Sequence, residues 1–354
     1  MSKAESDENI AVASITAAAM EVRNRRASKW LRRAGMLALG AVGSALALGA
    51  ASLPLSGMLI RPRLKRLSHL KRPHLRRLLE RIEIRFEDVM IPSFDALRLH
   101  GWWMGSSKDS ATVVVIHGVK KNRTDVLRAA VALRRAGFNV LVFDGRAHGN
   151  SEGRYVTYGY YERRDVETAI QWLIDERGID ADRIGLAGES MGAAIALQVA
   201  AESPFVRAVW ADSPFASLRR VTEEFASRVT RLPQVVLSPV LWTTIRMANY
   251  RGKFNVESVD PLKHADQIKC PVFLVHGTED QVIAANHSRD IHSALLGDKE
   301  IWIVEGGTHA RSIRHQLTKR EYIERLVRFF SEKLKPRIPV EEKHPSESSE
   351  HGAA

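Results

Sequence analysis

From residue 82 onward, short apolar runs alternate along the chain with longer segments in which apolar residues recur at helical spacing. Two strands are expected first, over residues 82–91 and 97–104, on either side of the turn-like sequence Pro-Ser-Phe-Asp. Six more apolar runs predict strands over residues 112–118, 138–144, 183–190, 206–212, 270–277 and 300–306. Helices are predicted over residues 125–137, 161–178 and 191–202, and after each of the last three strands. This order predicts an α/β fold in which helices cover both faces of a mostly parallel sheet.

The alternation of strands and helices is interrupted between residues 213 and 260. Apolar residues there keep helical spacings, but Pro233 and Pro239 break the pattern. We therefore expect a small helical cap insert above the sheet edge, within one domain that covers residues 82–335. Residues 336–354 are rich in Pro, Ser and Glu and are predicted to form a disordered tail.

An uncharged run of 27 residues covers positions 34–60. A helix of about 20 residues crosses the hydrocarbon core of a bilayer, and Leu, Ala, Val and Gly dominate this run as they do membrane helices. The run is therefore predicted to be a transmembrane helix. The alternatives are a cleaved signal peptide, whose apolar core would be shorter and would begin sooner, and a helix that packs on the soluble domain.

Basic residues flank that run in the segments 1–33 and 61–81. Residues 1–85 hold 17 Lys and Arg against 6 Asp and Glu, a net charge of +11, which leaves only +1 for the remaining 269 residues. The domain lacks the broad basic stripe of a nucleic-acid enzyme, so no nucleic-acid partner is expected. Slightly more Lys and Arg follow the run than precede it, which predicts a basic juxtamembrane linker over residues 61–81 and favours a cytoplasmic domain.

The sequence Gly-Glu-Ser-Met-Gly, residues 188–192, has the spacing G-x-S-x-G between a predicted strand and a predicted helix. In that context the serine stands on a tight strand-to-helix turn, where a side chain on Gly188 or Gly192 would crowd the backbone. The helix start directs the free amide of Met191 and the positive end of the helix dipole at the reacting oxygen. Ser190 is therefore the predicted nucleophile.

A serine hydroxyl needs a base to take its proton, and the base must itself be oriented by a third group. In this architecture an acid and then a histidine follow the serine along the chain. Asp280 comes just after the seventh predicted strand, and His309 just after the eighth. Loops at the carboxyl ends of parallel strands share one edge of the sheet. Asp280 and His309 are predicted to complete a triad, and Glu279 and Asp212 are the alternative acids.

The oxyanion of an acyl-transfer reaction needs two backbone donors. The amide of Met191 is the first candidate. The amide of Val119 is the second, because it lies in the loop after the third predicted strand, where His117 and Gly118 let the chain bend inward.

Other groups suited to chemistry are few. His276 is expected to pack at a strand end, and His148 to lie in a tight turn near the site without a role in proton transfer. The single cysteine, Cys270, excludes an intramolecular disulfide and a cysteine cluster for zinc. No metal or organic cofactor is expected.

Five motifs in order, VIHGVKKNR, DGRAHGNSEG, GESMGAA, HGTEDQVI and GGTHARS, resemble those of the α/β-hydrolase superfamily. Their spacing, and the sequence Ala-Asp-Ser-Pro-Phe after the sixth strand, are most similar to the prolyl-oligopeptidase-like and serine-aminopeptidase-like branch, which includes many membrane-anchored hydrolases. The resemblance covers about residues 82–335 and implies an eight-stranded sheet with a triad of Ser190, Asp280 and His309. The chain departs from relatives at Val-Lys-Lys in the oxyanion loop, where small residues are common, and no propeller precedes the core as in a true prolyl oligopeptidase.

Together these features predict a serine hydrolase that cleaves an ester, a thioester or an amide through an acyl-enzyme on Ser190. A peptidase that acts on short peptides is the first alternative. A catalytically silent binding protein with the same fold is the second, and the complete set of triad residues argues against it. The expected partners are a small acyl or peptide substrate and the membrane, through residues 34–60.

Overall fold

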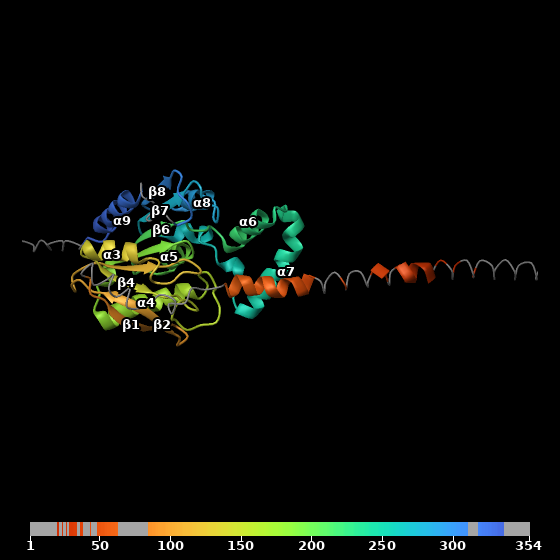
Figure 1. Ribbon diagram of the computed structural model, residues 1–354, viewed down its shortest axis with the longest axis horizontal. Helices are drawn as coiled ribbons and strands as arrows, with labels where there is room; N and C mark the ends of the chain where they lie inside the picture. The colour runs from red at the N-terminus through yellow and green to blue at the C-terminus, as the bar shows by residue number, and fades with distance from the viewer. Residues whose placement is uncertain are drawn as a thin grey trace, which may run out of the picture.

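The computed structural model describes residues 48–62, 84–310 and 318–335, and scattered positions between residues 20 and 43 (Figure 1). The strands are β1 (Glu87–Pro92), β2 (Arg98–Met104), β3 (Thr112–Ile116), β4 (Asn139–Phe143), β5 (Ile184–Glu189), β6 (Val206–Asp212), β7 (Val272–Gly277) and β8 (Lys299–Val304). The helices are α3 (Leu127–Arg135), α4 (Glu162–Arg177), α5 (Met191–Glu202), α6 (Leu218–Thr230), α7 (Gln234–Gly252), α8 (Asn286–Ala294) and α9 (Lys319–Lys333).

The eight strands form one sheet in the order β1-β2-β4-β3-β5-β6-β7-β8. β2 pairs antiparallel with both β1 and β4, and every other neighbouring pair is parallel. The central strands β3, β4 and β5 are buried along their whole length, as expected of parallel strands that are covered on both faces. The predicted α/β fold with a mostly parallel sheet is therefore confirmed.

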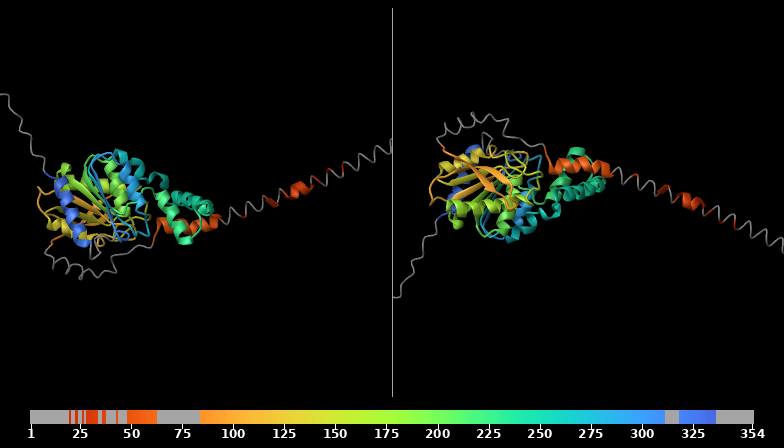
Figure 2. Two further views of the ribbon diagram at one scale, coloured as in Figure 1. Left: turned by 90° about the horizontal axis from the view of Figure 1, so that it is seen from above. Right: turned by 90° about the horizontal axis from the view of Figure 1, so that it is seen from below.

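Helices cover the two faces of the sheet as two separate layers (Figures 1 and 2). Side chains alternate along a strand, so Val113 and Val115 of β3 join the core beneath α3 and α9. Val114 and Ile116 point the other way, into the core beneath α4, α5 and α8. The α5 helix is apolar almost all round, with ten of its twelve residues buried, because it lies between the sheet and the outer helices.

The predicted cap insert contains α6 and α7, which extend beyond one end of the sheet (Figure 1). Pro233 separates the two helices, as expected, and directly precedes the first residue of α7. Pro239 does not break the pattern, which corrects the prediction, because α7 continues through it. A proline near the start of a helix removes one backbone hydrogen bond, and the remaining thirteen residues carry the helix on.

Residues 48–60 form a helix that packs on the cap. Ile60 is fully buried beside Ile245 and Ala248 of α7, and Tyr158 donates a hydrogen bond to the carbonyl of Leu59 at 3.0 Å. Ser52 Oγ lies 2.6 Å from Thr243 Oγ1. This half of the uncharged run thus contacts the domain, as in the alternative of a helix packed on it.

The predicted transmembrane helix over residues 34–60 is not confirmed. Among the residues that the structure describes, no helix combines the length and the apolar character that a membrane span requires. Positions 34–35, 38–42 and 44–47 of that run lie outside the described residues. The same holds for the predicted tail 336–354 and for most of the basic segments 1–33 and 61–81.

Candidate active site

Ser190 stands on the turn between β5 and α5, as the sequence predicts. Its backbone has φ of 55° and ψ of −116°; a positive φ of this kind is unfavourable for any residue that has a side chain, and such conformations concentrate at functional sites. A side-chain carbon on Gly188 would lie 2.2 Å from the carbonyl oxygen of Gly192, and one on Gly192 would lie 2.2 Å from that of Ile116. The two glycines therefore let the turn pack tightly against β3.

Asp280 and His309 meet Ser190 at the carboxyl edge of the sheet. His309 Nδ1 lies 2.6 Å from Asp280 Oδ2, and His309 Nε2 lies 2.8 Å from Ser190 Oγ. Since a carboxylate only accepts hydrogen bonds, Nδ1 carries the ring proton and Nε2 accepts from the serine hydroxyl. The loops after β5, β7 and β8 thus bring together three side chains that are distant in the sequence. Ser190 and His309 are 119 residues apart, and Asp280 and His309 are 29 residues apart.

Asp280 is held in its ionised form by the groups around it. Burial alone would raise its pKa, but hydrogen bonds from His276, His309 and the amide of Ile283 outweigh burial, and the pKa lies well below the usual range of an aspartate. The amides of Val282 and Ile283 donate to Oδ1 at 2.8 and 2.9 Å. The carboxylate is therefore fixed in position and stays charged.

His276 contacts Asp280, which the sequence reasoning did not foresee. Its Nε2 lies 3.2 Å from Asp280 Oδ2 and 2.9 Å from the carbonyl oxygen of Ile283, while Nδ1 lies 2.7 Å from Ser288 Oγ. Two acceptors at Nε2 place a proton there, so the ring donates to the carboxylate. The spacing of four residues between His276 and Asp280 was the available signal, but it becomes a contact only because the chain turns sharply after β7.

The alternative acids lie elsewhere in the site. Asp212 is fully buried and accepts a hydrogen bond from Ser213 Oγ at 2.9 Å, and burial raises its pKa. Glu279 is exposed. Neither is hydrogen-bonded to His309, whereas Ser213 Oγ accepts from the amide of Ala310 at 3.2 Å and so ties down the loop that carries the histidine.

The loop after β3 approaches Ser190 closely. A side-chain carbon on Gly118 would lie 3.3 Å from Ser190 Cβ, so the loop that carries Val119 passes close to the serine. Met191 begins α5, where the first amides of a helix have no partner within it. Lys121 of the same loop forms an ion pair with Glu189 at 3.1 Å, a contact that the sequence did not predict.

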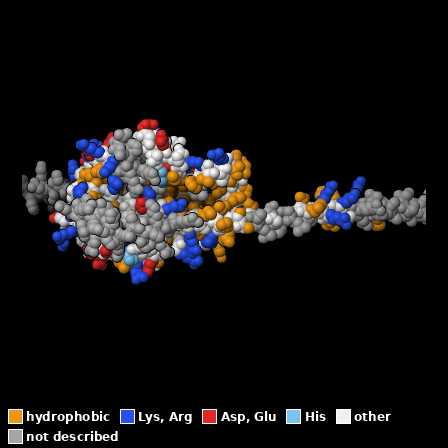
Figure 3. Space-filling view, in the orientation of Figure 1, with side chains coloured by type: hydrophobic (Ala, Val, Ile, Leu, Met, Phe, Trp, Pro, Cys, Tyr) orange, Lys and Arg blue, Asp and Glu red, His pale blue; other side chains and the backbone are white. Residues whose placement is uncertain are grey.

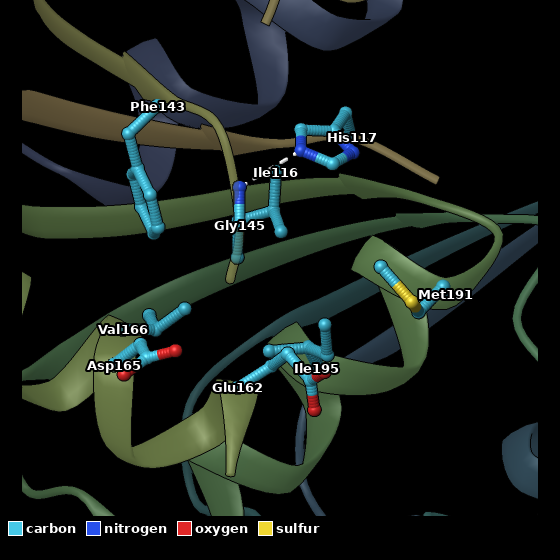
Figure 4. Close-up of a pocket in the computed structure, with 9 residues that line it drawn as sticks. All are labelled: Ile116, His117, Phe143, Gly145, Glu162, Asp165, Val166, Met191 and Ile195. Carbon is cyan, nitrogen blue, oxygen red and sulfur yellow. Dashed lines mark hydrogen bonds between the residues drawn. The ribbon is translucent and has the colours of Figure 1, made fainter. Parts of the chain in front are cut away.

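A small cavity of about 10 Å³ lies between the sheet and helices α4 and α5, next to the first residue of α5 (Figure 4). This volume is about that of a single water-sized probe, so the cavity is far too small for a substrate. His117 lines it and accepts a hydrogen bond from the amide of Gly145 at 2.9 Å. Burial lowers the pKa of His117 and of the neighbouring His148 to about 4, so both rings are neutral at pH 7. In the described part of the chain, no group of three His, Cys, Asp or Glu side chains is placed to hold a metal ion.

A family model, the prolyl oligopeptidase family, matches residues 124–337, which include all three side chains that meet at the sheet edge. The chain belongs to the prolyl oligopeptidase family. It is 32% identical to YqkD of Bacillus subtilis, an uncharacterized protein, over 231 residues that make up 63% of this chain and 72% of YqkD. The predicted superfamily is thereby confirmed.

Solved structures place this prolyl oligopeptidase family member among esterases and peptidases. The Pyrococcus furiosus esterase Pf2001 is 27% identical, covers 73% of this chain and 94% of its own, and superposes with a TM-score of 0.60. A Mycobacterium tuberculosis puromycin-hydrolyzing peptidase shares the fold, with 20% identity, a TM-score of 0.58, and coverage of 72% of this chain and 40% of its own. The comparisons therefore support a hydrolase with a serine-hydrolase type of fold.

Proposed function

We propose that this protein is a serine hydrolase that forms an acyl-enzyme on Ser190, with His309 as the general base and Asp280 as the group that orients it. The observation that carries the proposal is the continuous pair of hydrogen bonds from Ser190 through His309 to Asp280, at 2.8 and 2.6 Å. A silent binding protein would have no need to keep this arrangement on a strained serine.

The reaction begins when Ser190 Oγ attacks the carbonyl carbon of an ester, thioester or amide and its proton passes to His309 Nε2. The negative charge on the carbonyl oxygen is held by the amides of Val119 and Met191. The intermediate then expels the alcohol, thiol or amine, which takes the proton from His309. A water molecule then gives a proton to His309 and attacks the acyl carbon, and the acid is released as Ser190 Oγ takes that proton back from His309.

A carboxylic ester is the favoured substrate class, because the Pf2001 esterase is 27% identical to this chain and the puromycin-hydrolyzing peptidase is only 20% identical. An aminopeptidase-like activity on short peptides is the second candidate, supported by the family match. p-Nitrophenyl esters of increasing chain length, assayed beside aminoacyl-anilides, distinguish the two. We expect turnover of the esters at a higher kcat/KM than of any anilide, and the reverse ranking would favour the peptidase.

Labelling by a fluorophosphonate probe tests the catalytic assignment. We expect the wild type to be labelled and Ser190→Ala to be unlabelled, because the probe reacts only with an activated serine. Ser203→Ala, a change at the other end of α5, is the matched control and should label like the wild type. Equal labelling of Ser190→Ala and the wild type would contradict the proposal.

A further inference from the structure

One end of the molecule carries a concentration of exposed apolar side chains. They come from the helix 48–60, from the end of α6 and from α7, and Figure 3 shows hydrophobic side chains gathered over this end. The apolar cap face is defined here by six of them: Leu53, Met58, Val229, Val235, Val236 and Trp242, all more than half exposed. Single exposed apolar residues are ordinary on protein surfaces, but a contiguous group of this kind marks a binding surface.

The cap face is one surface although its parts are distant in the sequence. Arg251 of α7 donates hydrogen bonds at 2.8 Å to the carbonyl of Leu53 and to Ser56 Oγ, and Ser52 Oγ meets Thr243 Oγ1 at 2.6 Å. These contacts turn the polar side of the helix 48–60 toward α7. The apolar side, with Leu53 and Met58, is left facing outward beside the exposed residues of α7.

The charge of this region has a single sign. From residue 225 to residue 256 the chain has no Asp or Glu, but it has five basic residues: Arg228, Arg231, Arg246, Arg251 and Lys253. The nearest acids toward the N-terminus, Glu223 and Glu224, are paired with Arg219 and Arg220. The helix 48–60 has no charge and is followed directly by Arg61. An apolar face whose own segments carry only positive charge is complementary to the headgroups and acyl chains of an anionic lipid surface.

We propose that the apolar cap face binds the surface of an anionic phospholipid bilayer, with Val235, Val236 and Trp242 inserted among the acyl chains and the basic residues at the headgroups. The uncharged run of the sequence, residues 34–60, ends with the helix 48–60 that contributes to this face. Arg228 donates a hydrogen bond to the carbonyl of Gln281, the residue after Asp280, so the lipid-bound surface adjoins the candidate active site. The inference does not depend on the proposed reaction.

An environment-sensitive fluorophore on a single cysteine tests the proposal in the full chain. Val235→Cys carries the label in a Cys270→Ser background, and Leu296→Cys is the matched control, since Val235 and Leu296 are each 78% exposed. Leu296 precedes β8 at the amino end of the sheet, away from the cap. With vesicles of phosphatidylcholine and phosphatidylglycerol, we expect a blue shift and a several-fold rise in emission at position 235 and neither at position 296.

The dependence on salt and lipid separates this binding from other causes. Emission at position 235 should fall as the salt is raised from about 0.15 M to about 1 M, because the Debye length shrinks from about 8 Å to about 3 Å. Vesicles of phosphatidylcholine alone should give a smaller change. The proposal would be overturned if the protein co-floats with the vesicles while the emission wavelength at position 235 does not shift, since other segments would then make the contact. A shift that follows protein concentration without vesicles would also overturn it, because a second copy would be the occupant.

Discussion

The charge of Asp280 controls the proton arrangement around His309. Three hydrogen-bond donors other than His309, namely the ring of His276 and the amides of Val282 and Ile283, favour the carboxylate and keep its pKa low despite burial. As long as Asp280 is ionised, His309 keeps its proton on Nδ1 and presents an acceptor to Ser190. An uncharged amide in its place could instead donate to Nδ1 and reverse the arrangement.

Asp280→Asn is expected to lower kcat for a p-nitrophenyl ester by a factor on the order of 10⁴, because the histidine would adopt the wrong tautomer. Circular dichroism should show the variant folded. Glu279→Gln removes the neighbouring, exposed carboxylate and is the matched control, with a kcat close to the wild type. A similar loss in both variants would show that Asp280 has no special part in the reaction.

The three residues of the predicted triad could be named from the sequence because each follows an apolar run that is recognisable as a strand. Their contacts with further residues could not. The ion pair of Lys121 with Glu189 and the hydrogen bond of His276 to Asp280 depend on the exact path of loops, which no periodic pattern encodes. The geometry brings the side chains of Ser190, Asp280 and His309 together, and the catalytic roles of these three residues stay predictions.

The turn between β5 and α5 owes its shape to the absence of side chains at two positions. The backbone of the turn approaches β3 so closely that a methyl group on Gly192 would overlap the carbonyl of Ile116. That overlap is with backbone, so the end of β3 and the start of α5 would have to move apart to admit the group. The turn as a whole therefore holds Ser190 in place.

Gly192→Ala is expected to lower the free energy of unfolding by about 3 kcal/mol or more, because the buried turn cannot admit the methyl group without strain. Gly297→Ala is the matched control, since a side-chain carbon there meets its nearest neighbour at an ordinary 3.6 Å. Urea denaturation of both variants measures the difference. Equal stability of the two would mean that the turn is less tightly packed than described.

The ends of a helix could be predicted from the sequence where the apolar pattern and a turn indicate the same first residue, and less well elsewhere. The predicted helix 191–202 coincides with α5 because a tight turn fixes its start. The long helix α7 passes through Pro239, which the sequence suggested would break it. Residues 48–60 could not be assigned from composition, because an uncharged run is equally compatible with a membrane helix and with a helix packed on the domain. The structure shows the packing, since Ser52 and Ser56 are buried and contact α7.

The buried histidines tie the stability of the whole domain to pH. Burial lowers the pKa of His148 from 6.5 to about 4, so the unfolded chain takes up a proton before the folded one does. The stabilising contribution of the neutral ring is complete above about pH 6.5 and is lost as the pH falls toward about 4. Burial raises the pKa of Asp165 to about 6, so this carboxyl makes the folded state more stable as the pH falls below about 6, opposite to the effect of His148.

His148→Gln should therefore make the stability less sensitive to acid. The amide of glutamine has no proton to gain, so the decline in the free energy of unfolding between about pH 6.5 and pH 4.5 should be shallower by about 1 kcal/mol per pH unit. Urea titrations at several pH values compare the variant with the wild type, in which Asp165 contributes equally. Parallel curves would show that His148 does not remain neutral in the folded protein.

The central claim is that Ser190 receives the acyl group, and rapid mixing with p-nitrophenyl acetate followed by acid quench and peptide mass spectrometry tests it most directly. We predict a burst of p-nitrophenol approaching one equivalent per enzyme, with one acetyl group on the peptide that contains Ser190. Asp280→Asn should show a much slower burst, and Ser190→Ala none. An acetyl group on another residue, or undiminished turnover by Ser190→Ala, would contradict the account.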